Sequence, residues 1–518
     1  MKSPSTTGKL AVLLTVCAAV LAINLDTTIV NVALPTVSDK LDAGTRSLQW
    51  IVDGYNLAFA ALVLAMGSVS DRFGRRPALI IGLVGFAVSS AVGALVTDAG
   101  ALIAARVAMG TFAALIFPTT LSIISNTFRE RRQRAAALGV WGAVVGIGVA
   151  AGPVAGGLLL EHFAWGSVFW ALVPLALLTA VAAFVLVPES RDPAVPALDL
   201  PGLALSVLML GTLTWTIIEA PGHGWASGTT LSGFAVAVLA LVAFVARERT
   251  AAHPMLDVSL FRDRRFSAAS GAVTITFFAL FGFIFLVTQY FQFVRGYGTL
   301  STGARILPVA LSIAVASVVG AQLAPRIGTK VVVTTGLVFF GSAFLWISTV
   351  AVDTSYSSVV VPQMVLMGLG MGLISTPATE SILLVLPPAR AGVGSAVNDA
   401  TRELGGTLGV AVVGSLFSSV YAHRLAEGRF GTLPGDVLGQ AKDSVGAALQ
   451  VAGGDPRLGS AFQAAFMDGF TTSCVVVGLV CLVGAVGTLL WLPGREVAPV
   501  APGDSAVEVA DRAPVAAA

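Results

Sequence analysis

The sequence predicts an all-α integral membrane protein with fourteen transmembrane helices, arranged as two six-helix bundles plus two inserted helices. The chain has 518 residues, of which 56% are hydrophobic and only 11% charged, and its mean hydropathy is +0.88. No class of water-soluble globular protein has this balance. Apolar runs of about 20 residues, the length that crosses a bilayer, recur along the whole chain. A short basic loop occurs at corresponding places in both halves, which indicates an internal repeat.

The apolar runs give the expected spans in order. We predict helices near residues 10–34, 47–69, 77–97, 100–126, 134–159, 166–187, 199–219, 229–246, 268–292, 301–325, 329–350, 357–386, 391–420 and 463–492. Most Lys and Arg residues fall in alternate loops, and because cytoplasmic loops are rich in these residues, both termini are expected in the cytoplasm. The first run has no convincing cleavage site, so we interpret it as a retained helix and not as a signal peptide.

The loops divide the chain into four parts. They are an N-terminal six-helix bundle at 1–188, a linker with two inserted transmembrane helices at 189–247, a C-terminal six-helix bundle at 248–493 and a disordered cytoplasmic tail at 494–518. Without the inserted pair, the loop at 72–76 and the loop at 326–330 are in register. We therefore expect the inserted helices to stand beside the two bundles, in contact with lipid.

A compact charged loop joins the second and third expected spans. Glycine permits close approach and sharp turns, an aspartate can pair with an arginine, and arginines lie in the headgroup layer. We interpret the loop as a conformational latch formed by Gly67, Asp71, Arg72, Gly74, Arg75 and Arg76. The alternative is that its three arginines are ordinary positive-inside anchors. The full pattern resembles the signature loop between the second and third helices of the major facilitator superfamily.

Two charged side chains lie well inside the first six spans. Asp26 is deep in the first span, near Asn24 and Asn31, and Arg106 is the only basic residue well inside these six spans. A charge near the bilayer centre costs about 2.5–3.5 kcal/mol on insertion scales, so such a residue is functional by default. The alternatives are a structural acid bonded to a neighbour for Asp26, and a structural ion pair for Arg106.

Further acids are found in the second and thirteenth spans. Asp53 is near the outer end of the second span, where it could face a cavity or anchor the helix at the interface. Asp399, Arg402 and Glu403 share one face of the thirteenth span, because they are spaced three and four residues apart. An internal ion network is the alternative to a functional role for them.

The fifth span carries a cluster of small residues. Its members are Gly148, Gly152, Pro153, Gly156 and Gly157. Glycines at these spacings permit close helix packing, and the proline removes a backbone hydrogen bond and bends the span.

Four motifs together resemble those of the fourteen-span drug:proton antiporters, the multidrug efflux type of the major facilitator superfamily. Besides the latch, residues 25–35 are similar to the first-helix motif Leu-Asp-x-Thr-x-Val-Asn-Val-Ala-Leu-Pro. The fifth-span cluster looks like the motif that separates exporters from importers, and residues 398–406 resemble the family's Asn-Asp-x-Thr-Arg-Glu-Leu-Gly-Gly run. The resemblance covers about residues 10–492 and implies the major facilitator fold.

This resemblance implies a proton-coupled antiporter that exports amphipathic, cationic small molecules, in multidrug or antibiotic efflux. Proton coupling would involve Asp26, Arg106, Asp53 and Glu403, and substrate binding would involve Asp26, Asp53, Asp399, Glu403 and Asn31. Burial in an apolar medium favours the neutral form of a carboxylic acid, so protonation and substrate binding could compete. The alternatives are an exporter of one endogenous metabolite and a facilitator without proton coupling.

The remaining expectations concern partners and location. We expect a secondary active transporter and not an enzyme, with no cofactor and no metal, since the chain has no Walker-type glycine loop. Cys17, Cys474 and Cys481 all lie in apolar runs, so no disulfide is expected. The expected partners are a small-molecule substrate, protons and the lipid bilayer, with no nucleic acid. The protein should function as a monomer, as a multi-pass protein of the cell inner (plasma) membrane.

Overall fold

The computed structural model describes residues 6–192, 198–385 and 391–494. The regular elements in these segments are all helical, and fourteen of the helices are long and apolar enough to cross a membrane. The prediction of an all-α membrane protein with fourteen spans is confirmed. The expected disordered tail lies outside the described residues, apart from its first residue.

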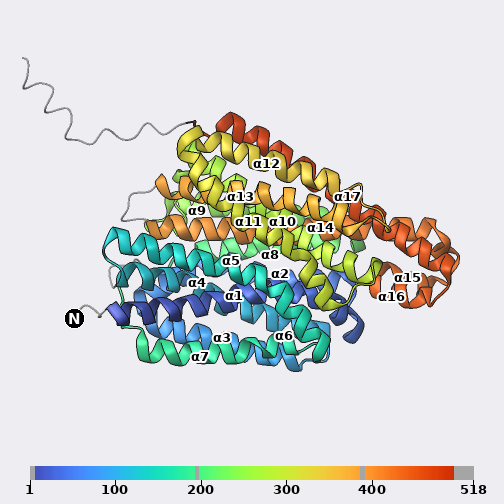
Figure 1. Cartoon of the computed structure of the whole chain (residues 1–518), viewed down its shortest axis with the longest axis horizontal. Helices are drawn as coiled ribbons and strands as arrows, with labels where there is room; N and C mark the ends of the chain where they lie inside the picture. Colours follow the sequence, from blue (N-terminus) through green and yellow to red (C-terminus); the bar gives the residue numbers. More distant parts are fainter. Residues whose placement is uncertain (1–5, 193–197, 386–390, 495–518) are drawn as a thin grey trace, which may run out of the picture.

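The first six spans occupy the lower part of Figure 1. They are α1 (Thr6–Lys40), α2 (Thr45–Phe73), α3 (Arg75–Leu95), α4 (Ala99–Thr127), α5 (Arg131–His162) and a divided sixth span, α6 (Ser167–Trp170) with α7 (Leu172–Leu186). The division has a local reason, since Pro174 in the first turn of α7 has no N–H to donate to the carbonyl of Trp170.

The last six spans form the second bundle. They are α10 (Arg264–Gln289), α11 (Thr299–Ile327), α12 (Thr329–Ile347), α13 (Val361–Leu384), α14 (Ala391–Glu427) and α17 (Pro456–Trp491). Two π-helical turns extend this set: η2 (Tyr290–Val294) continues α10, and η3 (Tyr356–Val360) precedes α13. A short 3-10 turn, η1 (Val258–Arg262), precedes this bundle.

Helices α14 and α17 are longer than the expected spans 391–420 and 463–492. The segment between them folds as η5 (Arg429–Thr432), α15 (Gly435–Asp443) and α16 (Val445–Ala452), which pack against the extended ends of α14 and α17 (Figure 1). Hydropathy alone could not predict these extensions, because helix that leaves the membrane need not be apolar. We call this end of the molecule the hairpin end, and the opposite end, where α1 begins and α17 finishes, the terminal end.

The two bundles repeat one packing plan. Helices α1, α2, α4 and α5 of the first bundle correspond in order to α10, α11, α13 and α14 of the second. The pair α1 and α5 matches the pair α10 and α14, and the pair α2 and α4 matches α11 and α13. The main contacts between the bundles are also related by this correspondence, since α2 packs on α14 and α5 packs on α11.

The two corresponding short loops have the same backbone geometry. Gly74 has φ 124° and ψ 130°, and Gly328 has φ 95° and ψ 138°. Both N–H groups bond the carbonyl four residues earlier, at Ser70 and Ala324. Only glycine adopts this region readily, so the loops need glycine at both positions. The internal repeat suggested by the sequence is therefore present in the backbone.

The bundles close on each other at the hairpin end. Gln49, near the start of α2, donates from Nε2 to the Ala411 carbonyl at 3.1 Å and to the Ser415 hydroxyl at 3.3 Å, both on α14. The missing side chain of Gly414 makes room for the amide, since a Cβ there would lie 2.5 Å from Gln49 Nε2. This buried glutamine ties the two bundles together across α2 and α14.

A second set of contacts closes the other side of the same end. Thr299 at the start of α11 donates to the Gly157 carbonyl of α5 at 3.1 Å, and Gln292 donates to the Val32 carbonyl of α1 at 3.0 Å. In the terminal half of α5, by contrast, a Cβ placed on Gly139, Gly142 or Gly146 would meet nothing within 4 Å. Among the described residues, the bundles are thus joined at the hairpin end.

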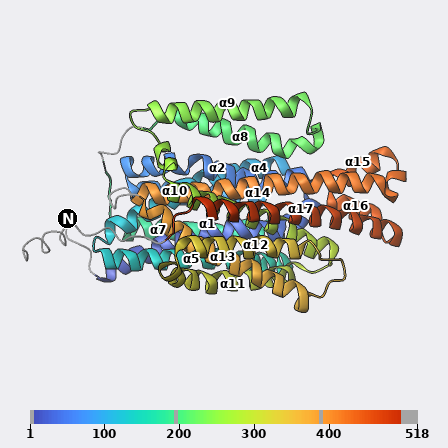
Figure 2. The same ribbon diagram turned by 90° about the horizontal axis from the view of Figure 1, so that it is seen from above.

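Helices α8 (Leu200–His223) and α9 (Gly228–Thr250) stand apart on one side of the molecule (Figure 2). Helix α8 packs on both α2 and α14, so it spans the seam between the bundles, whereas α9 packs mainly on α8. At the hairpin end Glu219 accepts from Arg46 at 3.2 Å and from Trp50 Nε1 at 3.5 Å.

The terminal end of this pair is fixed by another ion pair. Asp199 caps α8 by accepting from the Gly202 N–H, and it accepts from Arg247 of α9 at 3.0 Å. Burial opposes ionisation of Asp199, but the hydrogen bonds from Arg247 and Gly202 outweigh it and lower the pKa of this carboxyl.

Closure at the hairpin end predicts a specific cross-link. A Cβ on Gly44, which precedes α2, would lie 3.9 Å from the Cβ of Asp443 at the end of α15, which is the separation found in disulfides. After a small shift of the Asp443 carbonyl, the double variant Gly44→Cys/Asp443→Cys should form a disulfide in membranes, measured by mass spectrometry after proteolysis. The native cysteines are buried, so they should not compete. Single-cysteine variants are the controls, and absence of the cross-link under oxidation would contradict the closed hairpin end.

Candidate functional site

Asp26 and Arg106 form a buried ion pair at the centre of the first bundle. Arg106 Nη1 lies 2.6 Å from Asp26 Oδ2, and neither side chain is more than 1% exposed. Arg106 Nε also donates to the Ile51 carbonyl at 3.0 Å, and the guanidinium lies 4.4 Å from the centre of the Tyr55 ring. The arginine therefore joins α1, α2 and α4, and the ion pair considered as an alternative for Arg106 is present.

The other oxygen of Asp26 is left without a partner. Asp26 Oδ1 is buried and accepts no hydrogen bond. The nearby amides do not serve it, because Asn24 donates to the Val20 carbonyl at 2.8 Å and Asn31 donates to the Thr27 carbonyl at 3.0 Å. Asp26 is therefore not stabilised by a neighbour on α1, and its Oδ1 is available to a proton or to another hydrogen-bond donor.

Asp53 is fully buried in the protein interior. Neither of its carboxyl oxygens has a hydrogen-bond partner, and its side chain is 0% exposed. This position does not fit an anchor at the membrane interface, which would leave the acid in contact with water or headgroups. Helical spacing along α2 could not distinguish the two alternatives, because it gives depth but not the direction that the side chain faces.

Two acids of the second bundle, Asp399 and Glu403, lie on α14. Asp399 is buried, and its Oδ1 lies 4.0 Å from Arg402 Nη1, while Glu403 has a buried Oε2 without a partner. Arg402 also lies over the Phe277 ring of α10 at 4.4 Å. The predicted common face of the three ionisable residues is thus present, but the carboxylates outnumber the bases there.

The small residues of α5 pack against two different helices. Cβ atoms placed on Gly148, Gly152 and Gly156 would collide with α1, at Asn24, Thr28 and Ile29 respectively. A Cβ on Gly157 would collide with α11, at the Thr299 carbonyl and Leu300, and the Pro153 carbonyl lies against Gly303 of α11. The cluster therefore lets α5 approach both the acid-bearing helix α1 and the opposite bundle.

The expected latch makes its described contacts with the segment that follows α7. Asp71 accepts from Arg75 at 2.6 Å, and its carbonyl accepts from the Asp192 N–H at 2.7 Å. The Arg75 N–H donates to the Ser190 carbonyl, and Arg76 pairs with Glu189 at 3.4 Å. Gly67 lies against Pro118 of α4, and Arg72 is exposed. In this conformation the loop is thus tied to the start of the linker.

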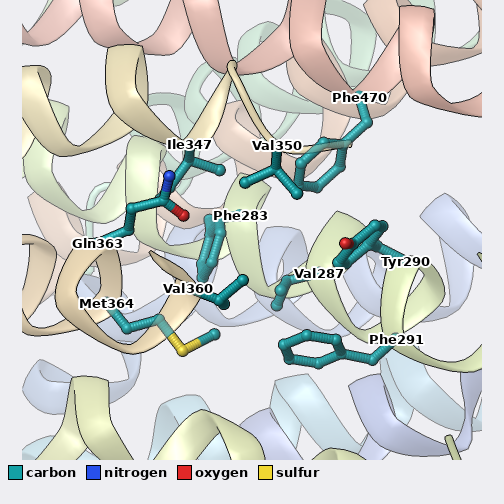
Figure 3. A pocket seen from close by; sticks show the side chains of 10 residues that line it. All are labelled: Phe283, Val287, Tyr290, Phe291, Ile347, Val350, Val360, Gln363, Met364 and Phe470. Carbon is teal, nitrogen blue, oxygen red and sulfur yellow. The ribbon is translucent and has the colours of Figure 1, made fainter. Parts of the chain in front are cut away.

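A small aromatic cavity lies inside the second bundle, among α10, α12, α13 and α17 (Figure 3). Phe283, Tyr290, Phe291 and Phe470 line it, together with the amide of Gln363. Its volume of ≈ 10 Å³ has room for about one water molecule. Sites for drug-sized ligands are about 300–1,000 Å³, so this cavity does not hold such a ligand in the present conformation.

Two residues near the ion pair could not be singled out from their sequence context alone. Tyr55 stacks on Arg106, and Gln49 joins the bundles, yet neither contact can be inferred from the local sequence. The signal that could have found Gln49 is a lone amide in an apolar span, which needs a partner across the helix interface.

The part of the chain that the structure describes has no group of three or more His, Cys, Asp or Glu side chains suited to a metal ion. What the site offers is a set of buried carboxylates, one buried arginine and several unpartnered polar atoms in a helical membrane protein. Such an arrangement can exchange protons and bind cations.

Comparison with known proteins agrees with this architecture. The family model of the Major Facilitator Superfamily matches residues 16–410. The chain belongs to this superfamily. The resemblance inferred from the four motifs is therefore confirmed, and this major facilitator is a transporter and not an enzyme.

The relatives of this major facilitator include named drug exporters. The multidrug efflux pump LfrA of Mycolicibacterium smegmatis is 35% identical, over 90% of this chain and 93% of its own. The tetracenomycin C resistance and export protein of Streptomyces glaucescens is 33% identical, over 92% of this chain and 90% of its own. A bacterial homologue of the lysosomal transporter Spinster, solved inward-facing and unoccupied, has a TM-score of 0.67 at 16% identity, over 94% of this chain and 98% of that one. This last similarity shows the common fold.

The buried ion pair predicts unequal effects of single and double substitutions. Arg106→Met should lower the free energy of unfolding by about 3–5 kcal/mol, because it leaves the Asp26 carboxylate buried without its counter-ion. Adding Asp26→Asn should recover part of this loss, since it removes the uncompensated charge. Thermal unfolding in detergent, followed by tryptophan fluorescence, measures both effects. If the losses of the two single variants simply add in the double variant, the pair has no energetic coupling.

Proposed function

We propose that this transporter is a proton-coupled antiporter that exports amphipathic, cationic small molecules across the cell inner membrane. The observation that carries the proposal is the buried pair of Asp26 and Arg106, in which one carboxyl oxygen is free for a proton. The relatives named as drug and antibiotic exporters support the direction of transport and the breadth of substrates.

The distribution of charge supports an orientation. The terminal end carries Arg72, Arg75 and Arg76, the basic ends of α5 and α9, and the start of α10. Because basic loops stay on the cytoplasmic side, we assign the terminal end to the cytoplasm, with both chain termini there. The joined hairpin end is then the outer side, and the conformation is one that is closed to the outside.

Proton coupling follows from the competition for Asp26. A proton on this carboxylate removes the negative charge that compensates Arg106, and an uncompensated buried arginine is strongly unfavourable. Since Arg106 also bonds the Ile51 carbonyl, protonation of Asp26 shifts the balance of contacts among α1, α2 and α4. The proton thereby favours a different packing of the first bundle, which is the requirement for driving alternating access.

Substrate cations would be attracted by the acids that lack a full set of partners. Asp53 and Glu403 have buried oxygens without hydrogen bonds, and Asp399 shares a single arginine with Glu403 on the same helix face. A positively charged group can satisfy these oxygens, whereas an anion would meet like charge. We assign substrate binding to these residues together with Asp26 and Asn31, and proton coupling to Asp26, Arg106, Asp53 and Glu403.

Alternating access needs contacts that form and break. Pro153 and Gly157 of the α5 cluster allow α5 to meet α11 closely when the outer side is closed, and these contacts must separate when it opens. At the cytoplasmic end the latch holds the linker in the present conformation. We propose that it changes partners when the inner ends of the bundles come together.

The central experiment uses Asp26→Asn in everted membrane vesicles. The amide keeps the size of the side chain and removes the titrating group, so efflux of a fluorescent cation driven by an imposed pH gradient should fall to background. Asp468→Asn is the matched control, because this acid is half exposed and pairs with Arg424 at 3.1 Å away from the ion pair. It should transport like the unmodified protein.

Three outcomes would redirect the proposal. Normal gradient-driven efflux by Asp26→Asn would show that another group carries the proton. Efflux by the unmodified protein that is indifferent to a protonophore would instead favour a facilitator. Transport of one endogenous metabolite, with no response to several unrelated cations, would favour a dedicated exporter.

A further inference from the structure

Tyr55 lies on α2, the helix of the first bundle that packs on α14, which carries Glu403. The side chain of Tyr55 is 1% exposed, and this tyrosine follows Ile51 by one turn on α2, so the same helix face presents both the Ile51 carbonyl and the Tyr55 ring to Arg106. The ring lies 4.4 Å from the guanidinium carbon, a distance at which cation–π attraction holds.

The hydroxyl of Tyr55 has a different environment from the ring. It is buried and forms no hydrogen bond of ordinary length, and the Thr27 hydroxyl of α1 lies near it. The charged groups that act on it are Asp26 of α1, Arg106 of α4 and, from the opposite bundle, Glu403 of α14. Arg402 and Asp399 lie beside Glu403, and Asp53 lies two residues before Tyr55 on α2.

Two acids that act electrostatically on this hydroxyl each have an unsatisfied buried oxygen. Asp26 Oδ1 and Glu403 Oε2 both lack a hydrogen-bond partner. A tyrosine hydroxyl has one hydrogen, so it can serve one of these oxygens at a time. Leaving the other oxygen ionised and unbonded in the interior is unfavourable. The charge states of Asp26 and Glu403 are therefore not independent.

We propose that Tyr55 is a positioning residue that couples substrate binding at Glu403 to protonation at Asp26, by donating its single hydroxyl hydrogen to one carboxylate or the other. This inference rests on the proposed antiport. When a substrate cation satisfies Glu403, the hydroxyl turns to Asp26, stabilises its ionised form and favours release of the proton. When Asp26 is protonated, the hydroxyl serves Glu403, which then binds a cation less strongly. A substrate cation at Glu403 and a proton on Asp26 thus exclude each other, although these two acids belong to different bundles.

Tyr55→Phe tests this coupling, because it keeps the ring over Arg106 and removes only the hydroxyl. The affinity of purified protein for tetraphenylphosphonium should fall as the pH is lowered across neutrality in the unmodified protein. In Tyr55→Phe the affinity at the alkaline end should be retained within a few-fold. The ratio of the affinity at alkaline pH to the affinity at acid pH should become about tenfold smaller, which corresponds to the free energy of one hydrogen bond to a charged group. Downhill efflux from proteoliposomes should persist while efflux driven by a pH gradient is lost.

Tyr421→Phe is the matched control. This tyrosine is also fully buried, but its hydroxyl donates to the Ala441 carbonyl at 3.1 Å beside α15, so its loss should leave the pH dependence unchanged. Size-exclusion profiles of both variants verify folding. If Tyr55→Phe keeps the pH dependence of the unmodified protein, the inference is overturned while the antiport stands. If the unmodified protein itself shows neither pH-dependent affinity nor gradient-driven efflux, the proposed function fails and the inference fails with it.

Discussion

The ion pair between Asp26 and Arg106 is the interaction on which the rest of the structure depends. Both charges are removed from water, so each is tolerable only while the other is in place. Because Arg106 also bonds the Ile51 carbonyl and stacks on Tyr55, the pair fixes how α1, α2 and α4 meet. Any event that neutralises Asp26 therefore acts on three helices at once. A site built in this way converts a change of one charge into a change of packing, which a solvent-exposed carboxylate could not do.

Small residues extend this effect to the second bundle. The glycines of α5 bring its backbone against α1 on one side and against α11 on the other. On the opposite side of the molecule, Gly414 admits the buried amide of Gln49, which bonds backbone carbonyls of α14. Helix association in a membrane gains little from the hydrophobic effect, so close backbone approach and buried polar contacts decide which faces meet. The closed hairpin end is made of both kinds of contact, and a few such contacts can be exchanged without unfolding either bundle.

The sequence predicted the fourteen spans because each needs a long apolar run, and it predicted Asp26 and Arg106 as special because charge is costly in such a run. It could not predict that these two residues pair, since their contact depends on how α1 and α4 cross. Residue spacing left open whether Asp53 faces the interior, and only the family resemblance favoured a role for it in the site. The extensions of α14 and α17 were missed because they need not be apolar, and Tyr55 and Gln49 because their partners lie on other helices. Family motifs indicated the superfamily, and the geometry shows which residues of these motifs contact one another.

The central claim is that substrate and proton compete for one coupled set of buried acids. The most direct measurement is the release of protons when a substrate cation is added to purified protein in weakly buffered detergent solution, followed with a pH-sensitive dye. The account predicts that the unmodified protein releases protons in proportion to the cation bound, and that the release disappears when Asp26 is replaced by Asn. Binding of the cation by the unmodified protein with no release of protons at any pH would contradict it.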